Sequence, residues 1–402
     1  MQTGMFGKVL PSVALRPGKW LARHPRSVHG GDKEPHSRPA DATRPVTARI
    51  PGLDLVRAVA ILLVLVCHCA NVFCNFWNKK PPDFVALSGV FGVELFFVLS
   101  GFLIGGLLAS SATACPGWRG WWVFMLRRWM RTLPLYFTAI AIMAVVWPPA
   151  DGRLAWHLLH YASLTQNLAW KMPADNWFGV SWSLTIEEWF YLLFSLPLLL
   201  AARWDKGRKS LPALVMVFIV VPNLVRFAAP PELDFGQVLY RAVAFRLDAI
   251  AYGVGASLIV TRYPGLLRRG GVWLATGLMI VAFVWVQIDG LGVAVPSWFY
   301  RFLFLPLLAF GFCCCLPAAL RLPQRSRWSA PCVFWLSTRS YGLYIVHLTV
   351  LEMATAAVFY HGFSRPGAIV SALAASAMLA ELSWRLIEQP VLRRRPVQAS
   401  VR

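Results

Sequence analysis

The sequence predicts an all-α polytopic membrane protein with about ten transmembrane helices and both termini in the cytoplasm. Hydrophobic residues make up 57% of the 402 positions and charged residues only 14%, which is more apolar side chain than one soluble core requires. After about fifty residues, apolar runs long enough to cross a bilayer recur to the C-terminus, separated by short loops rich in Arg, Pro and Gly. The distribution of basic residues, described below, is a third indication.

Three regions follow one another along the chain. Residues 1–48 are basic and rich in Pro, Gly, Ser and His, which predicts a disordered cytoplasmic tail. Residues 49–395 form the predicted transmembrane domain, and 396–402 form a short C-terminal tail. The predicted spans are 53–74, 84–108, 130–148, 182–202, 211–228, 237–261, 271–288, 299–319, 333–359 and 366–388. The long exterior loop 149–181 has helical spacing, which fits either a helix along the outer membrane surface or a helix packed between spans.

The formal charge of +21 raises the question of a nucleic-acid partner. With the N-terminus in the cytoplasm, the cytoplasmic segments hold 27 of the 39 Lys and Arg residues, whereas the exterior loops hold 5. This asymmetry is the positive-inside rule. The orientation of the protein in the lipid bilayer is therefore enough to explain its net positive charge, and we expect no nucleic-acid partner.

The eight cysteines lie mostly inside apolar runs and lack paired CxxC spacing. They are typical of small buried hydrophobic residues and indicate neither a disulfide framework nor a zinc site. Cys67 and Cys69 flank His68, but residues two apart on a helix point to nearly opposite sides. We therefore expect no metal here.

Ionisable side chains inside predicted spans are costly and usually face the interior of the bundle. Arg57 and His68 both lie in the first span, eleven residues or about three helical turns apart, so they share one face and lie about 16 Å apart along the axis. Arg57 is then near the cytoplasmic surface and His68 in the outer half. Histidine gains and loses a proton near neutral pH, which makes His68 a candidate acid or base.

Other ionisable groups lie at comparable depth in later spans. Glu94 is expected roughly 14 Å below the outer surface and Glu187 within about two turns of it. Arg246, Asp248 and His347 fall in the middle or outer half of their spans. Structural explanations also fit: Arg246 with Asp248, or Glu94 with an arginine, forms an ion pair that fixes packing, and His347 is a hydrogen-bonded core histidine.

At the cytoplasmic edge, the segment LRRWMRTLPLYF contains Arg128 and Arg131. They are three residues apart and so on one helix face, a spacing that suits multidentate binding of phosphate. Arginines in this place also satisfy the positive-inside rule and reach lipid phosphates. Both explanations remain open.

These charges together describe a polar path through the bundle, and two classes of function fit it. A transporter would bind and release a solute or protons along it. A group-transfer enzyme would bind an anionic donor at the cytoplasmic arginines, place its reactive end at a histidine, and receive an acceptor from the opposite side. The residue pattern alone does not separate the two.

Seven segments in order resemble the signatures of the acyltransferase-3 family, integral membrane acyltransferases that modify sugars and related alcohols. The resemblance covers residues from about 50 to 395. The segments are LDLVRAVAILLVLVCH, GVELFFVLSGFLI, RRWMRTLPLYF, WSLTIEEWFYLLF, FRLDAIAYG, STRSYGLYIVHL and WRLIEQPVLRR.

The resemblance assigns roles to the candidate residues. Arg57 and His68 match the family's R-x10-H motif, whose histidine is the favoured catalytic residue. Arg128 and Arg131 match its R-x-x-R motif, which is thought to help hold acyl-coenzyme A. Glu94 takes the place of an acidic residue that is often Asp in the family. The residues implied to be catalytic are therefore His68, Arg57, Glu94 and Glu187, and those implied to support substrate or structure are Trp182, Ser183, Arg246, Asp248 and His347.

The implied reaction transfers an acyl group, with acetyl expected, from cytoplasmic acyl-coenzyme A to a hydroxyl of a carbohydrate or lipid-linked sugar, in the modification of cell-surface polysaccharide. Acyl-coenzyme A is a co-substrate, and no bound cofactor is expected. His68 either deprotonates the acceptor hydroxyl or carries the acyl group itself. The expected location is the cell inner membrane, with a second acyltransferase or polysaccharide-assembly proteins as partners. A transporter or flippase of a glycan or small solute is the alternative.

Overall fold

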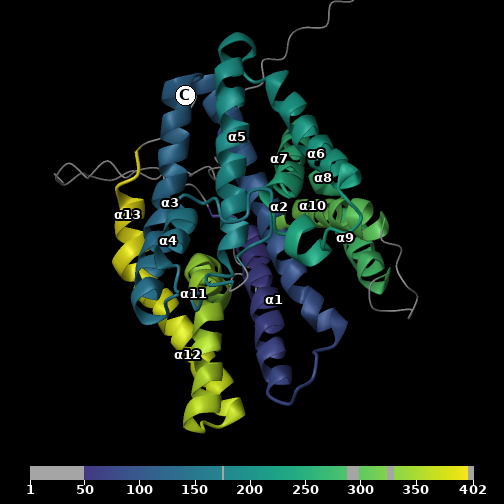
Figure 1. The fold of residues 1–402 in the computed structure, drawn as a ribbon. Helices are drawn as coiled ribbons and strands as arrows, with labels where there is room; N and C mark the ends of the chain where they lie inside the picture. Colours follow the sequence, from purple (N-terminus) through teal and green to yellow (C-terminus); the bar gives the residue numbers. More distant parts are fainter. Residues whose placement is uncertain (1–48, 174–175, 288–297, 324–329, 397–402) are drawn as a thin grey trace, which may run out of the picture. The chain divides into compact units, whose positions relative to one another are not determined.

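The computed structural model describes residues 49–173, 176–287, 298–323 and 330–396, and within these ranges every regular element is a helix (Figure 1). This agrees with the predicted all-α class. The predicted disordered tail, 1–48, lies outside the described residues, as does nearly all of the predicted C-terminal tail, 396–402.

Eight helices in the described part are long and apolar enough to cross a membrane. The chain is therefore a multi-pass membrane protein. The eight are α1 (Pro51–Asn75), α2 (Asp83–Ala114), α3 (Trp118–Val146), α5 (Ser181–Asp205), α6 (Ser210–Ala228), η4 with α10 (Phe299–Phe304 and Leu305–Leu320), α11 (Pro331–His361), and α12 (Arg365–Ser383) continued by η6 (Trp384–Glu388) and α13 (Gln389–Arg393).

Two predicted spans are shorter in the structure. The segment 271–288 gives α9 (Gly270–Trp285), of 16 residues, which follows the short α8 (Gly265–Arg268). The segment 237–261 is not one helix, because η1 (Phe235–Leu239) and η2 (Val243–Phe245) precede α7 (Asp248–Arg262), of 15 residues. The number ten and the cytoplasmic position of both termini thus stay predictions.

The break before α7 has a physical cause in the backbone hydrogen bonds. The N–H groups of Val243 and Ala244 donate to the carbonyl oxygens of Asn167 and Leu168, each at 2.9 Å, instead of closing helical turns. Asp234 also accepts from the backbone N–H of Gln237 at 2.5 Å, which starts a separate turn. Hydropathy does not detect such non-local bonds.

Helices α3 and α4 (Leu154–Ala162) differ from the predicted boundaries of the spans and loops. Helix α3 begins twelve residues before the predicted span, so Arg128 and Arg131 lie inside a continuous helix and not at its entry. Arginine is a good helix former, so a pair of arginines does not interrupt the helix. Helix α4 forms within the predicted exterior loop.

A turn before α4 fixes its start. Asp151 accepts from the backbone N–H of Arg153 at 2.9 Å and lies 3.0 Å from the buried ring of His157. These hydrogen bonds lower the pKa of the exposed Asp151 carboxyl below its usual value.

Glycines allow two central helices to touch through their backbones. A Cβ at Gly101 of α2 would lie 2.0 Å from the carbonyl oxygen of Ile250 in α7, and one at Gly253 would lie 2.1 Å from that of Val98. Because such contacts are too short for any side chain, α2 and α7 approach as closely as helices can.

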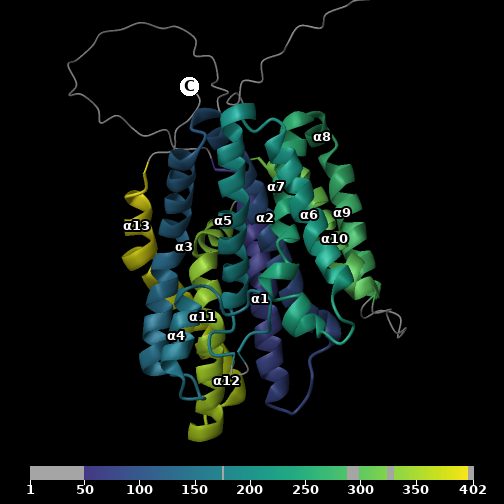
Figure 2. The same cartoon turned by 45° about the horizontal axis from the view of Figure 1, so that its top comes forward.

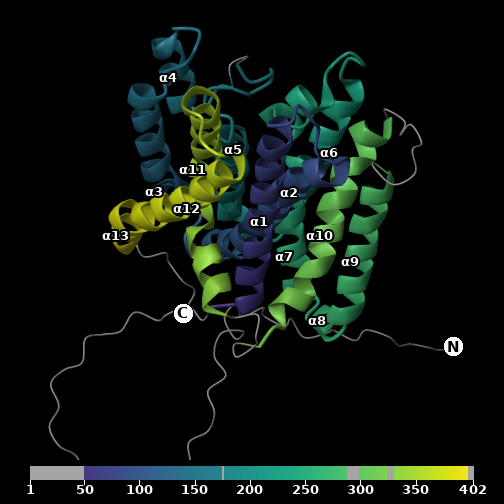
Figure 3. The ribbon, with the colours of Figure 1, turned by 90° about the horizontal axis from the view of Figure 1, so that it is seen from below.

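Helix α1 lies between α2 and α11, which Figure 3 shows from below. The connections 76–82 and 362–364 lie at one end of the bundle, and the turn between α5 and α6 lies at the other (Figures 1 and 2). In the orientation that the basic residues predict, the first end is exterior and the second is cytoplasmic.

Candidate active site

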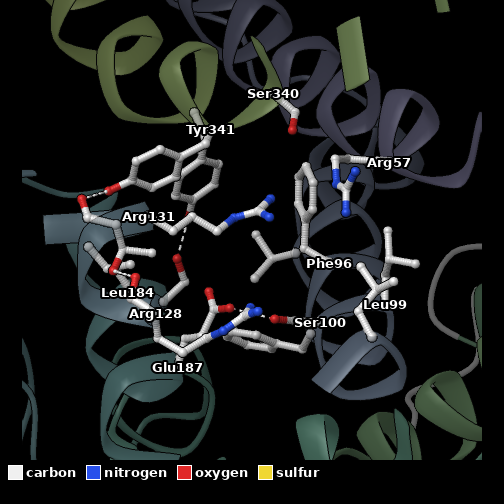
Figure 4. Close-up of a pocket in the computed structure, with 16 residues that line it drawn as sticks. Arg57, Phe96, Leu99, Ser100, Arg128, Arg131, Leu184, Glu187, Ser340 and Tyr341 are labelled. Atoms are coloured by element: carbon white, nitrogen blue, oxygen red, sulfur yellow. Dashed lines mark hydrogen bonds between the residues drawn. The ribbon is translucent and has the colours of Figure 1, made fainter. Parts of the chain in front are cut away.

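A cavity of about 110 Å³ lies between α1, α2, α3, α5 and α11. Its charged and polar lining consists of arginine, glutamate, serine, threonine and tyrosine side chains, and Figure 4 shows most of them. They are Arg57, Ser100, Arg128, Arg131, Thr132, Ser183, Glu187, Ser340, Tyr341 and Tyr344. The apolar lining is Val93, Phe96, Phe97, Leu99, Leu103 and Leu184.

Three arginines from two helices line this cavity. Arg128 and Arg131 come from α3, which confirms that they share a face, and Arg57 comes from α1. Figure 4 shows Arg57 and Arg131 on opposite sides of the Phe96 ring, with Arg128 beside Glu187. Since Glu187 is the one carboxylate among the lining residues, the cavity is positively charged and suits an anion.

Arg57 is held by a link between α1 and α11. Its Nη1 donates to the Ser337 hydroxyl at 3.3 Å and lies 3.7 Å from the Asp54 carboxylate. The Ser337 hydroxyl in turn donates to the same Asp54 oxygen at 2.6 Å. These contacts fix the guanidinium at the wall of the cavity.

Glu187 accepts two hydroxyl hydrogen bonds. The Ser100 hydroxyl donates to its Oε1 at 2.5 Å, and the Tyr191 hydroxyl donates to the same oxygen. The guanidinium carbon of Arg128 lies 5.9 Å from the centroid of the Tyr191 ring. The carboxylate is thus fixed next to the arginines, where it offsets part of their charge.

A second carboxylate, Glu188, stands behind the wall. The buried Thr132 hydroxyl donates to it at 2.6 Å, and the Tyr341 hydroxyl donates to the carbonyl oxygen of Thr132 at 2.6 Å. Sequence reasoning assigned no role to these hydroxyl residues or to Ser100 and Tyr344. All four lie in or beside the segments that carry the family resemblance, but a neutral hydroxyl in an apolar run gives no signal of its own.

The structure brings His68 of α1 against His347 of α11. Their ring centroids are 5.2 Å apart, with His347 fully buried and His68 partly exposed. The sequence did not predict this pairing, although it placed both residues at similar depth.

The hydrogen bonds of His347 define its tautomer. Its Nδ1 lies 3.0 Å from the carbonyl oxygen of Leu343 and 2.9 Å from that of Tyr344. A carbonyl oxygen only accepts, so Nδ1 carries the proton and Nε2 of the neutral ring is unprotonated. Nε2 is buried and has no hydrogen-bond partner among the described residues. His347 therefore offers a free proton acceptor next to His68.

Tyr344 connects the cavity to the two histidines. It lines the cavity, its hydroxyl lies 2.6 Å from that of Ser183, and its ring centroid is 5.9 Å from that of His347. His68 itself is not among the lining residues. Tyr344 and His347 thus lie between the cavity and His68, and the path from the arginines to His68 stays a prediction.

Glu94 lies apart from this path. Its buried carboxylate accepts from the buried Arg246 guanidinium at 2.5 Å, while the Asp248 carboxylate pairs with Arg226. The predicted pairing of Arg246 with Asp248 is therefore wrong, whereas the pairing of Glu94 with an arginine is confirmed. No hydrogen bond or ion pair joins Glu94 or Asp248 to His68 in the described part of the chain, so neither orients that imidazole.

Trp182 and Ser183 separate into two environments. Trp182 is buried, with its ring centroid 4.8 Å from that of Tyr240, and the Arg246 guanidinium lies 5.2 Å from the same Tyr240 ring. It packs beside the ion pair with Glu94. Ser183 instead lines the cavity.

Comparison with known proteins identifies the family of the chain. The acyltransferase domain family matches residues 50–382. The putative peptidoglycan O-acetyltransferase YrhL of Bacillus subtilis is 27% identical over 85% of this chain and 55% of its own length. The peptidoglycan O-acetyltransferase OatA of Listeria monocytogenes is 24% identical over 85% and 56%, and the acyltransferase MdmB of Streptomyces mycarofaciens is 23% identical over 88% and 95%.

The chain thus spans about half the length of the two peptidoglycan O-acetyltransferases. No solved structure matches it significantly. Because the family's domain covers nearly every helix described above, the chain belongs to the acyltransferase-3 family.

Proposed function

We propose that the protein transfers an acyl group, acetyl being the expected one, from cytoplasmic acyl-coenzyme A to a hydroxyl of a carbohydrate or related acceptor in the cell envelope. Its place is the cytoplasmic membrane. The observation that carries the proposal is the positively charged cavity, with three arginines, whose wall reaches the His68–His347 pair through Tyr344. The names of the relatives favour O-acetylation.

The cavity suits the two parts of the donor. Arg128, Arg131 and Arg57 supply charge-assisted hydrogen bonds for the phosphates of coenzyme A. The apolar lining, which includes Phe96 and Leu184, suits the narrow pantetheine arm. This arrangement directs the thioester toward Tyr344 and the histidines.

Two routes use the histidine pair. In direct transfer, an imidazole removes the proton of the acceptor hydroxyl as the oxygen attacks the thioester carbonyl; the C–O bond forms, the C–S bond breaks and the thiolate takes the proton. In the stepwise route, a nitrogen of the His68 imidazole attacks the thioester carbonyl, the C–N bond forms, the C–S bond breaks and the thiolate leaves. The acceptor oxygen then attacks the acyl-imidazole carbonyl, the C–O bond forms, the C–N bond breaks and a histidine nitrogen takes the hydroxyl proton. The unprotonated Nε2 of His347 supplies a proton acceptor in both routes.

The acceptor is proposed at the level of chemical class only, a carbohydrate hydroxyl of the envelope, with peptidoglycan and lipid-linked sugars as members. The relatives named as peptidoglycan O-acetyltransferases are about twice as long as the part that matches this chain. We also propose that other polysaccharide-assembly proteins cooperate in delivering or completing the reaction.

The test combines the purified protein with intact cells. Detergent-solubilised protein given acetyl-coenzyme A should release free thiol faster than a His68→Ala variant does, and envelope glycans from cells expressing the wild type should carry acetyl groups that the variant lacks. Counterflow of a sugar or nucleotide into liposomes without any covalent change would instead support the transporter or flippase.

A further inference from the structure

Residues 394–396, which follow α13, lie against the first half of α3, although the two segments are far apart in the sequence. Figures 1 and 2 show α13 beside α3. The Arg127 guanidinium of α3 donates to the carbonyl oxygen of Pro396. This hydrogen bond places the preceding residue, Arg395, against the same helix that carries the cavity arginines.

Arg395 thereby joins a group of arginines. We call Arg127, Arg128, Arg131 and Arg395 the arginine cluster. Burial and the like charges of the other three members lower the pKa of Arg395. No ion pair joins any member to a carboxylate of the described residues. Glu187 beside Arg128 offsets only part of the charge of these four close cations, and the net positive charge that remains points to a multiply charged anion as the ligand.

Unused hydrogen-bond donors support the same conclusion. Nε and Nη2 of Arg395 are buried without a hydrogen-bond partner within the described residues, and so is Nε of Arg128. Buried donors of this kind are costly to leave unpaired. A phosphate oxygen is the acceptor whose charge and geometry suit a guanidinium.

The cluster has an inner and an outer part. Arg128 and Arg131 line the cavity, whereas Arg127 and Arg395 do not. In the predicted orientation, α3 starts at the cytoplasmic side and Arg395 follows the cytoplasmic end of the last helix. The positive charge therefore extends from the cavity toward the cytoplasm.

Coenzyme A carries its three phosphates in two places, at different distances from its thioester. The pyrophosphate follows the pantetheine arm, and the ribose 3′-phosphate lies beyond it; together they carry about four negative charges at neutral pH. We propose that Arg395, together with Arg127, binds the 3′-phosphate of the donor, while Arg128 and Arg131 bind the pyrophosphate. This assignment rests on the proposed use of acyl-coenzyme A, and it names the residue that distinguishes coenzyme A from dephospho-coenzyme A.

The experiment measures binding of coenzyme A and dephospho-coenzyme A by calorimetry to the full chain in a maltoside detergent, which contains no phosphate. Arg395→Gln should weaken coenzyme A binding about tenfold, as expected for one charge-assisted hydrogen bond at a partly exposed site, and should change dephospho-coenzyme A binding by less than about twofold. Arg394→Gln removes the same charge from the exposed neighbouring residue and should leave both affinities unchanged. Arg395→Lys, which keeps the charge but not the planar fork, should be intermediate.

Three results would overturn the assignment. Equal weakening of both ligands by Arg395→Gln would mean that Arg395 acts only as a general positive charge. An unchanged affinity in Arg395→Gln, with weaker binding in Arg128→Ala/Arg131→Ala, would remove Arg395 from the site and leave the proposed donor intact. A wild-type protein that binds no coenzyme A would overturn both proposals.

Lipid headgroups also carry phosphate, so a separate experiment must distinguish lipid binding from coenzyme A binding. Thermal unfolding with and without added phosphatidylglycerol compares wild type with Arg395→Gln. The assignment predicts that phosphatidylglycerol stabilises both proteins equally. If the variant loses that stabilisation and keeps the wild-type affinity for coenzyme A, Arg395 is a lipid-binding residue and the assignment is wrong. The same unfolding curves show whether each variant is folded.

Discussion

The rings of His68 and His347 lie 5.2 Å apart, although they come from α1 and α11. Replacing His68 by Ala should abolish acyl transfer while leaving folding and membrane insertion intact, because the reacting imidazole is lost. Thiol release from acetyl-coenzyme A and glycan acetylation measure the effect, with Cys69→Ala on the same helix as the control. Near wild-type transfer by His68→Ala would exclude this residue as catalytic.

A variant of His347 can distinguish the hydrogen-bonding role of Nδ1 from the proton-accepting role of Nε2. His347→Asn keeps a donor near the Nδ1 position for the backbone carbonyls but has no group in place of Nε2, so the protein should fold while kcat falls by about 10²- to 10⁴-fold, the usual contribution of a general base. The donor KM should stay near the wild-type value. A wild-type kcat in the Asn variant would reduce His347 to a packing residue.

The inner arginines should determine donor affinity. Replacing both Arg128 and Arg131 by Ala removes two phosphate contacts and should raise the donor KM about 100-fold, taking about tenfold for each, with a much smaller effect on kcat. Arg119→Ala, an exposed position on the same helix, is the matched control. If the KM does not change, the pair serves only to anchor the helix to lipid phosphates.

Neutralising Glu187 should strengthen donor binding. It is the one carboxylate that lines the cavity, so it repels an incoming phosphate, and Glu187→Gln should tighten coenzyme A binding severalfold whereas Glu187→Asp should not. Calorimetry on the purified variants measures this. Weaker binding in the Gln variant would show instead that the carboxylate holds Arg128 in place.

Glu94 should matter for stability. Glu94→Gln leaves the Arg246 guanidinium buried without its counter-charge, which costs about 3–5 kcal/mol of unfolding free energy for a buried pair. Thermal unfolding in detergent should show the loss, and the double variant Glu94→Leu/Arg246→Met should recover part of it. A stable Glu94→Gln protein with a reduced kcat would restore Glu94 to the catalytic group.

The sequence predicts the charged part of the site well. Arg57 and Glu187 line one cavity because an ionisable group inside a span has few alternatives to the interior of the bundle. Arg128 and Arg131 line it too, although the sequence also allowed them to reach lipid phosphates. Spacing along a single helix, such as that of Arg57 and His68, also carries over directly, because α1 is continuous.

The sequence did not predict which side chains of different helices contact one another. The sequence allowed an arginine as the partner of Glu94 but did not identify Arg246, which lies just before α7, the helix that touches α2 through glycines. No single segment reveals that contact. Tyr344 and Ser183 are uncharged, so the search for ionisable groups inside spans did not point to them. The break before α7 depends on hydrogen bonds to residues 167 and 168. Each of these features belongs to the packed bundle.

The glycine contact between α2 and α7 supports the cavity from outside its lining. The backbones of Gly101 and Ile250 are in direct contact, and the Glu94–Arg246 pair also links α2 to the chain just before α7. Helix α2 carries Phe96 and Ser100 in the lining of the cavity, whereas α7 contributes no residue to that lining. A substitution at Gly253 would therefore disturb the cavity through the position of α2, without touching the cavity itself.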